Sequence, residues 1–199
     1  DLNQIDKRLK KLYDRAQEAK KSKNIPYAIV MLRELLNKEP GLLEIREELR
    51  QLQYQRIGGK TSFLHQTIAD IIALFYKIPN AKLLSRDDEK SIRKAMDNAE
   101  KVLSFDPTST AAIKLFDRAA FEAFLPAVCV QTLEWGVNFH PNNTFLWERL
   151  AEAYATAGEG RRCLNVWKKL HELHPKNQHY EKKVSDGQTE AAIENMGLG

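Results

Sequence analysis

Apolar residues recur along this chain every three or four positions, and alternation over strand lengths is absent. This spacing predicts amphipathic helices joined by short turns. Proline marks several helix ends, because the residue before a proline is pushed out of the α region. Between Pro40 and Pro107 the pattern predicts three helices, at roughly 41–56, 62–78 and 86–104, with Ser85 as the N-cap of the third. A last amphipathic helix is predicted over about 177–195.

Several features repeat at a fixed interval. Pro107, Pro141 and Pro175 are spaced by 34 residues, and Cys129 and Cys163 keep the same spacing. An interval of about 34 residues is typical of arrays of helix–turn–helix units. Such units stack to bury their apolar faces, and the stack is more often a binding surface than a catalytic one.

The segment Thr144–Asn177 resembles a tetratricopeptide repeat. It carries the residues of that family's pattern: Trp147, Leu150, Ala151, Tyr154, Cys163, Trp167, Leu170 and Pro175. Residues 110–143 and 9–42 look like further copies. The resemblance implies an all-α fold, a right-handed α-solenoid of stacked helix–turn–helix hairpins closed by a C-terminal capping helix.

We divide the chain into three parts. Residues 1–42 form an N-terminal hairpin, 43–109 an irregular helical region, and 110–199 two clear hairpins with the capping helix. The middle part contains three helices, so one of them has no partner in a strict two-helix count. This odd helix marks either a divergent repeat or a junction between two short arrays.

Composition excludes several classes of function. The chain of 199 residues is 43% hydrophobic and 29% charged, and its most apolar stretch, Ile68–Tyr76, is too short to span a bilayer. We find no signal-peptide pattern and expect a cytoplasmic protein. The net charge of +4 is concentrated in the first 60 residues. Lys7, Lys10 and Lys11 could contact nucleic acid or an acidic surface, but acidic residues interrupt the cluster, which favours an exposed helix face.

Candidate chemistry is weak. Gly58-Gly59-Lys60-Thr61 lacks the first glycine and the strand of a phosphate-binding loop, which favours a turn between helices. His171 and His174 have no convincing third metal ligand. Cys129 and Cys163 occupy packing positions, and we predict that both are buried and unpaired. We therefore expect no enzyme, metal or cofactor.

The resemblance places the binding site on the first helix of each hairpin, whose positions 2, 5, 9 and 12 face the concave groove. The groove residues implied here are Tyr13, Gln17, Lys114, Arg118, Phe121, Phe145, Glu148, Glu152 and Lys182. Two interpretations fit the charged ones. Lys114, Glu148 and Lys182 would form a ladder of ion pairs between repeats, or they would orient a bound peptide with the phenylalanines as anchors.

These residues predict a scaffold that binds a protein or peptide in its concave groove. Two alternatives stay open. One is nucleic-acid or acidic-surface binding through the basic N-terminal helix, for which we expect steep salt dependence. The other is self-association into a homo-oligomer through the odd central helix or Ile68–Tyr76.

Overall fold

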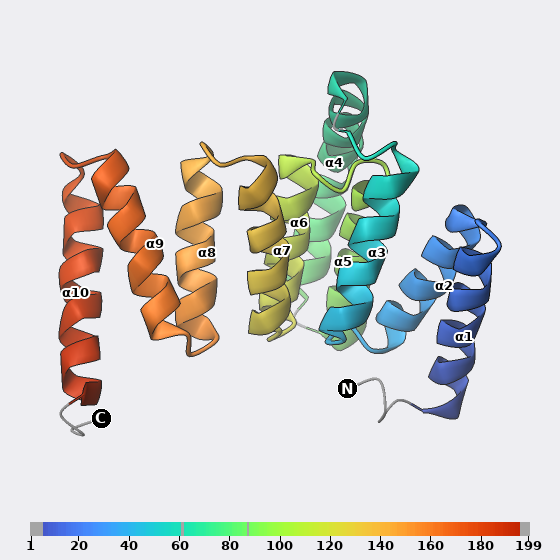
Figure 1. Cartoon of the computed structure of the whole chain (residues 1–199), viewed down its shortest axis with the longest axis horizontal. Helices are drawn as coiled ribbons and strands as arrows, with labels where there is room; N and C mark the ends of the chain where they lie inside the picture. The colour runs from blue at the N-terminus through green and yellow to red at the C-terminus, as the bar shows by residue number, and fades with distance from the viewer. Residues whose placement is uncertain (1–5, 61, 87, 196–199) are drawn as a thin grey trace. The chain divides into compact units, whose positions relative to one another are not determined.

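The computed structural model describes residues 6–60, 62–86 and 88–195, and the regular structure in these ranges is entirely helical (Figure 1). The helices are α1 (Lys7–Lys21), α2 (Ile25–Lys38), α3 (Leu43–Arg56), α4 (Phe63–Leu84), α5 (Glu89–Leu103), α6 (Thr110–Glu122), α7 (Pro126–Phe139), α8 (Thr144–Thr156), α9 (Gly160–Leu173) and α10 (Gln178–Asn195). They form two compact units, Asp1–Val128 and Cys129–Gly199, which divide inside α7. The division into three parts by repeats remains a prediction.

The turns inside the repeats share one backbone conformation. Lys23, Phe124 and Gly158 follow α1, α6 and α8 at the same repeat position, and they have positive φ values of 60°, 55° and 77°. The next residue in each case donates its N–H to the carbonyl five positions back, at 2.8, 3.1 and 2.8 Å. This bond satisfies a carbonyl that the helix end would leave without a partner.

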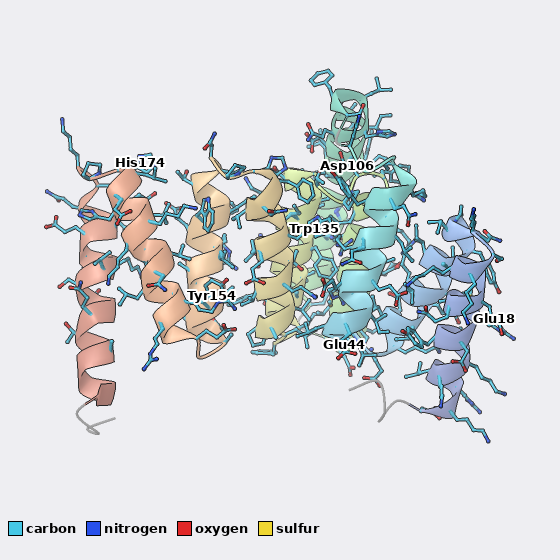
Figure 2. All side chains as sticks on the ribbon, viewed as in Figure 1. Glu18, Glu44, Asp106, Trp135, Tyr154 and His174 are labelled. Carbon is cyan, nitrogen blue, oxygen red and sulfur yellow. The ribbon has the colours of Figure 1, made fainter. Side chains whose placement is uncertain are left out.

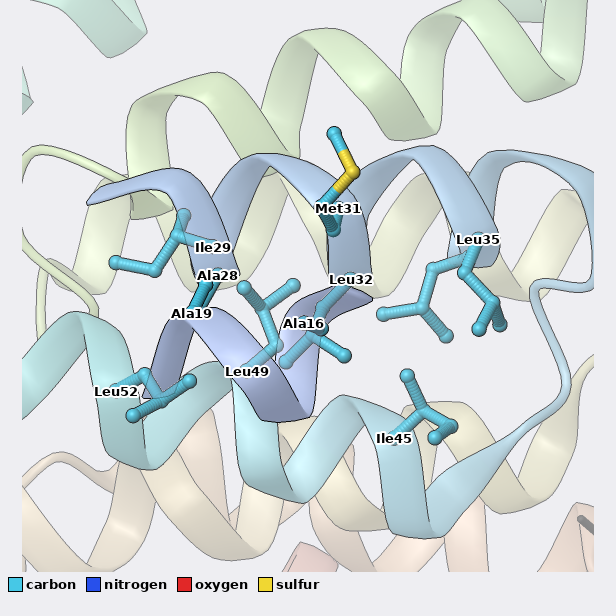
Figure 3. Packing of buried hydrophobic residues seen from close by; sticks show 11 residues of the cluster. Ala16, Ala19, Ala28, Ile29, Met31, Leu32, Leu35, Ile45, Leu49 and Leu52 are labelled. Carbon is cyan, nitrogen blue, oxygen red and sulfur yellow. The ribbon is translucent and has the colours of Figure 1, made fainter. Parts of the chain in front are cut away.

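The first unit has a hydrophobic core between α1, α2 and α3. Figure 3 shows buried residues of the three helices packed together: Ala16 and Ala19 of α1, Leu32 and Leu35 of α2, and Ile45 and Leu49 of α3. Ala16 is only 1% exposed, and its small side chain lets α1 and α2 approach closely. Burial of several leucines in one cluster contributes about 1.5–3 kcal/mol for each side chain.

A buried polar network joins α3 to α5. Arg50 donates to both carboxylate oxygens of Glu100, at 2.8 and 3.0 Å, and Gln53 donates to the same carboxylate at 2.9 Å. Arg46 contacts Glu100 at 3.4 Å, and its guanidinium lies 4.7 Å from the ring centroid of Phe116 on α6. Helix α3 therefore has its charged partner on α5, and α4 intervenes between the two in sequence.

Helix α4 is the odd helix of the middle region. It is longer than the predicted 62–78, because Pro79 lies within it rather than ending it. Pro79 is exposed, so water can satisfy the carbonyl whose hydrogen bond the proline removes. Beyond the proline, Asn80 donates to the Ala95 carbonyl at 3.1 Å and accepts from Asn98 at 3.0 Å, which holds α4 on α5.

The predicted cap of the third central helix is wrong. Ser85 is the C-cap of α4, and the N-cap of α5 is Asp88, which accepts from the Ser91 N–H at 2.9 Å. Because α4 continues to Leu84, Ser85 ends that helix and cannot begin α5.

In the second unit, α10 covers the apolar side of α9. Tyr180 is 5% exposed and its ring lies 6.0 Å from that of Trp167, so the predicted capping helix is confirmed. Cys129 is buried, but Cys163 is only half-buried, so that part of the prediction is wrong; neither cysteine forms a disulfide.

Candidate functional site: a slot between α4 and α6

The first unit contains a cavity of about 410 Å³ between α4 and α6. This volume lies within the range of about 300–1,000 Å³ that small-molecule and cofactor sites occupy. The lining residues come from these two helices: Asp70, Ala73, Leu74, Lys77, Asn80, Ala81 and Leu84 from α4, and Ala111, Lys114, Leu115 and Arg118 from α6. We call this cavity the α4–α6 slot.

The wall from α6 presents two basic side chains one helical turn apart. Lys114 and Arg118 are both exposed, whereas Ile113, Phe116 and Ala120 of the same helix are buried. The apolar side of α6 fixes the helix in the core, and the opposite side turns its two cations toward the slot. These are two of the groove residues predicted from the repeat positions.

The wall from α4 is fixed at both of its ends. Near the start of α6, Ser109 donates to the Asp70 carboxylate at 2.9 Å, and its hydroxyl also accepts from the Ala112 N–H at 3.2 Å as the helix cap. Further along, the buried side chains of Asn80 and Leu84 hold α4 in place. The slot is therefore bounded by two helices that hydrogen bonds and packing hold at a fixed spacing.

The slot combines an apolar lining with a basic rim. Ala73, Leu74, Leu84 and Leu115 supply apolar surface, and the charged lining residues are three cations and one acid. The acid, Asp70, is already engaged by the Ser109 hydroxyl. This arrangement can accept an apolar side chain while the basic groups attract a carboxylate beside it.

The predicted groove residues of α1 lie outside the slot. Gln17 donates to the Glu48 carboxylate of α3 at 2.9 and 3.0 Å, and Lys20 pairs with the same group. Tyr13 is partly buried beside them, and burial followed by the charge of Glu48 raises its pKa. These side chains tie α1 to α3.

Phe121 lies on α6 beyond Arg118 and is half exposed. In the second unit, Phe145 is 42% exposed and Lys182 is exposed on α10. Glu148 accepts a hydrogen bond from the Tyr180 hydroxyl at 2.5 Å, and this bond is the first cause that raises the pKa of Tyr180 to about 12. Glu152 pairs with Arg149 on its own helix. Glu148 thus contacts a partner, Tyr180, that the predicted ladder of Lys114, Glu148 and Lys182 did not include.

Sequence reasoning missed the α4 wall of the slot. The repeat pattern assigns groove positions only within complete hairpins, and α4 belongs to none. A signal was present in the apolar run Ile68–Tyr76, which contains Asp70 and is followed at once by Lys77. Polar residues at helical spacing within such a run indicate a helix with one face outside the core.

The glycine-rich segment and two of the histidines have local structural contacts. Gly58 and Gly59 have positive φ and close the end of α3, where the Gly59 N–H donates to the Tyr54 carbonyl at 3.0 Å. The turn interpretation is confirmed for these glycines, whereas Thr61 lies outside the described residues. The rings of His174 and His179 lie 6.0 and 5.9 Å from the ring of Tyr180.

Hairpins that share one turn, spaced repeats and a capping helix define an all-α helical-repeat fold of the tetratricopeptide type. The crystal structure of a thermophilic TPR protein from Thermus thermophilus matches with a TM-score of 0.50 and 11% identity, covering 91% of this chain and 99% of that one. The crystal structure of MamA protein matches with a TM-score of 0.45 and 15% identity, covering 96% and 83%. The match to the Thermus thermophilus protein confirms the predicted resemblance at the level of the fold.

No family model and no curated protein matches the sequence. In the part of the chain that the structure describes, no helix has both the length and the apolarity needed to cross a bilayer.

Proposed function

We propose that this protein is a non-catalytic scaffold that binds a segment of a protein partner, with the α4–α6 slot as the primary contact. The observation that carries the proposal is the placement of Lys114, Arg118 and Lys77 around an apolar slot of about 410 Å³. The partner segment is amphipathic, with an apolar anchor and acidic neighbours. Stacked helical repeats commonly present such surfaces to partner chains.

The two parts of the slot have different roles in binding. The anchor side chain enters the apolar lining of Leu74, Leu84 and Leu115, where loss of water gives most of the affinity. The basic groups at the rim attract and orient the acidic residues, so they affect the association rate and its salt dependence. A partner with basic residues beside the anchor is rejected by like charge.

Each unit also carries predicted groove residues outside the slot. Phe121 continues the α6 surface beyond Arg118, and we keep it as a further contact of the first unit. Phe145 and Lys182 are exposed on the second unit, and we keep them as candidate contacts of that unit by itself. The remaining predicted groove residues contact neighbours within their own unit, and we keep them as supporting contacts there: Tyr13 and Gln17 in the first unit, Glu148 and Glu152 in the second.

The test compares wild type with Lys114→Glu/Arg118→Glu in affinity capture from lysate of the source cell. A matched control, Lys90→Glu/Lys94→Glu, reverses two exposed lysines of α5, neither of which lines the slot. We expect proteins that bind wild type and the control to be lost from the slot variant. Synthetic segments of a captured protein, measured by fluorescence anisotropy, should bind the slot variant at least about 10-fold more weakly, a loss of about 1.4 kcal/mol.

Equal capture by all three proteins would contradict the proposal. Loss only when Lys7, Lys10 and Lys11 are neutralised, with a steep dependence on salt, would instead support the alternative of nucleic-acid or acidic-surface binding.

A further inference from the structure

Helix α4 carries a second surface, on the side opposite its contact with α5. The buried residues of α4 are Ala69, Ala73, Asn80 and Leu84. Its other side exposes seven large apolar side chains: Phe63, Leu64, Ile68, Ile71, Leu74, Phe75 and Ile78. Their exposed fractions run from 42% for Ile68 to 85% for Phe63.

Five of these residues form a continuous line. Leu64, Ile68, Ile71, Phe75 and Ile78 follow one another at alternating intervals of four and three, which keeps them on one face of the helix. We call this line the α4 stripe. It is about 21 Å long, at a rise of about 1.5 Å per residue. Alternating intervals of this kind are those by which one helix packs lengthwise against another.

The exposed area is large for a monomer. Leu74 also lines the slot; with about 150–200 Å² for each of the other six large apolar residues, their exposed fractions leave roughly 600–800 Å² of apolar surface in water. The largest apolar patch on a typical monomer is about 300–600 Å². A standard protein interface buries about 800 Å² on each partner. The surface on α4 is therefore close to the area of one side of a standard interface.

The charges on α4 identify the kind of partner. Asp70 and Lys77 line the slot, away from the α4 stripe, and the five stripe residues themselves are all uncharged. A membrane-surface helix would carry several basic residues along its borders, whereas here Lys82 alone follows the stripe, one turn beyond Ile78. The surface fits another apolar helix face of equal length.

We propose that this partner is a second copy of the chain, bound through its own α4 in a two-fold homodimer. In an antiparallel pair centred on Ile71, Leu64 of one copy faces Ile78 of the other, and Ile68 lies between Ile71 and Phe75 of the other. A two-fold interface must be self-complementary, and a stripe without charges satisfies that condition. Figures 1 and 2 show that the N-terminal end of α4, with its side chains, extends beyond the ends of its neighbours α3, α5 and α6 in the first unit.

This inference goes beyond the slot function, and its test uses different residues. Ile71 and Phe75 lie in the α4 stripe but do not line the slot, whereas Lys114 and Arg118 line the slot but lie outside the stripe. The variant is Ile71→Glu/Phe75→Glu. Both side chains are exposed, so we expect its helical circular dichroism to match that of wild type. The matched control, Val30→Glu/Leu173→Glu, changes two exposed apolar residues of α2 and α9.

The measurement is molar mass by sedimentation equilibrium over a wide concentration range. The chain has a mass of 22.9 kDa, and we expect wild type and the control to reach twice that value. The α4 variant should stay at the monomer mass, with its dissociation constant raised by about 100-fold or more. Wild type that stays monomeric at millimolar concentration would overturn the proposal. A dimer that survives in the α4 variant would overturn it as well, and binding of the wild-type monomer to anionic vesicles would assign the surface to a membrane instead.

Discussion

Residues with positive φ at the repeat turns show how one backbone position accepts different side chains. The position following α1, α6 and α8 is lysine, phenylalanine and glycine in turn, and all three adopt the left-handed conformation. For residues other than glycine this conformation costs roughly 1–2 kcal/mol. Phe124 is 87% exposed, so little packing offsets that cost.

Replacement of Phe124 by glycine should therefore stabilise the first unit. We expect Phe124→Gly to raise the free energy of unfolding by about 0.5–1 kcal/mol, because relief of backbone strain exceeds the entropy that glycine loses on folding. Urea denaturation followed by circular dichroism measures the change.

The converse control is Gly158→Ala, where no atom lies within 4 Å of the added carbon, so the backbone alone decides the effect. It should destabilise the second unit by about 1 kcal/mol. A loss of stability in Phe124→Gly, or a gain in Gly158→Ala, would show that strain at this turn position does not limit stability.

Among the elements, α3 and α5 are joined by charges rather than by apolar packing alone. Burial alone would raise the pKa of Glu100, but Arg50, Arg46 and the Gln53 hydrogen bond outweigh it and lower that pKa to about 2. Burial is also the main cause that lowers the pKa of Arg46 to about 10. Two buried cations share one carboxylate, so the network depends on that carboxylate staying ionised.

The network predicts a specific acid sensitivity. A carboxyl whose pKa is lower in the folded state stabilises the fold above its unfolded pKa of about 4.3 and loses that effect as the pH falls toward 2. Glu100→Gln should lower the free energy of unfolding by about 3–5 kcal/mol at neutral pH, since it leaves buried arginines without a counter-charge. Urea titrations at several pH values should show this difference shrinking below about pH 4.

The control for this prediction is Glu47→Gln, the same change at an exposed position of α3. It should alter the free energy of unfolding by less than about 0.5 kcal/mol. If the free energies of unfolding of wild type and Glu100→Gln differ by the same amount down to pH 2, the carboxylate charge does not stabilise this pair of helices.

At this scale the sequence predicted the hairpins and the three central helices, but not how the central helices pair. Proline spacing and residues of the repeat pattern such as Ala151 located α1, α2 and α6 to α9, because each repeat is set by interactions within about 34 residues. Arg50 and Glu100 are 50 positions apart, so their pairing leaves no pattern within a single repeat of the sequence. The continuation of α4 past Pro79 depends on tertiary packing of Asn80 and Leu84. The sequence predicted Lys114 and Arg118 as site residues. It did not predict the α4 wall of the slot, because the position of α4 depends on that tertiary packing.

The whole molecule divides into two compact units, and its tryptophans report on only one. Trp135, Trp147 and Trp167 are the three tryptophans of the sequence, and all lie after Val128 in the second unit. Circular dichroism, in contrast, reports on the helices of both units. Repeat proteins owe their stability to contacts between neighbouring repeats, so separate units can unfold at different denaturant concentrations.

We expect the two probes to give different urea midpoints. Glu100→Gln should move the circular dichroism transition to lower urea while the tryptophan fluorescence transition stays in place, because the change lies in the first unit. Coincident transitions in wild type, displaced together in the variant, would show instead that the two units unfold as one.

The pairing of α3 with α5 also has a consequence during synthesis. Arg50 and Glu100 are 50 residues apart in sequence, whereas the two helices of a hairpin are joined by turns of about three residues. At a synthesis rate of about 5–20 residues per second, roughly 3–10 seconds pass between the addition of the arginine and the addition of its carboxylate. Throughout that interval α3 emerges beside a completed α1–α2 hairpin without its final partner. The core of α1, α2 and α3 can therefore form before the buried ion pair with α5 is complete.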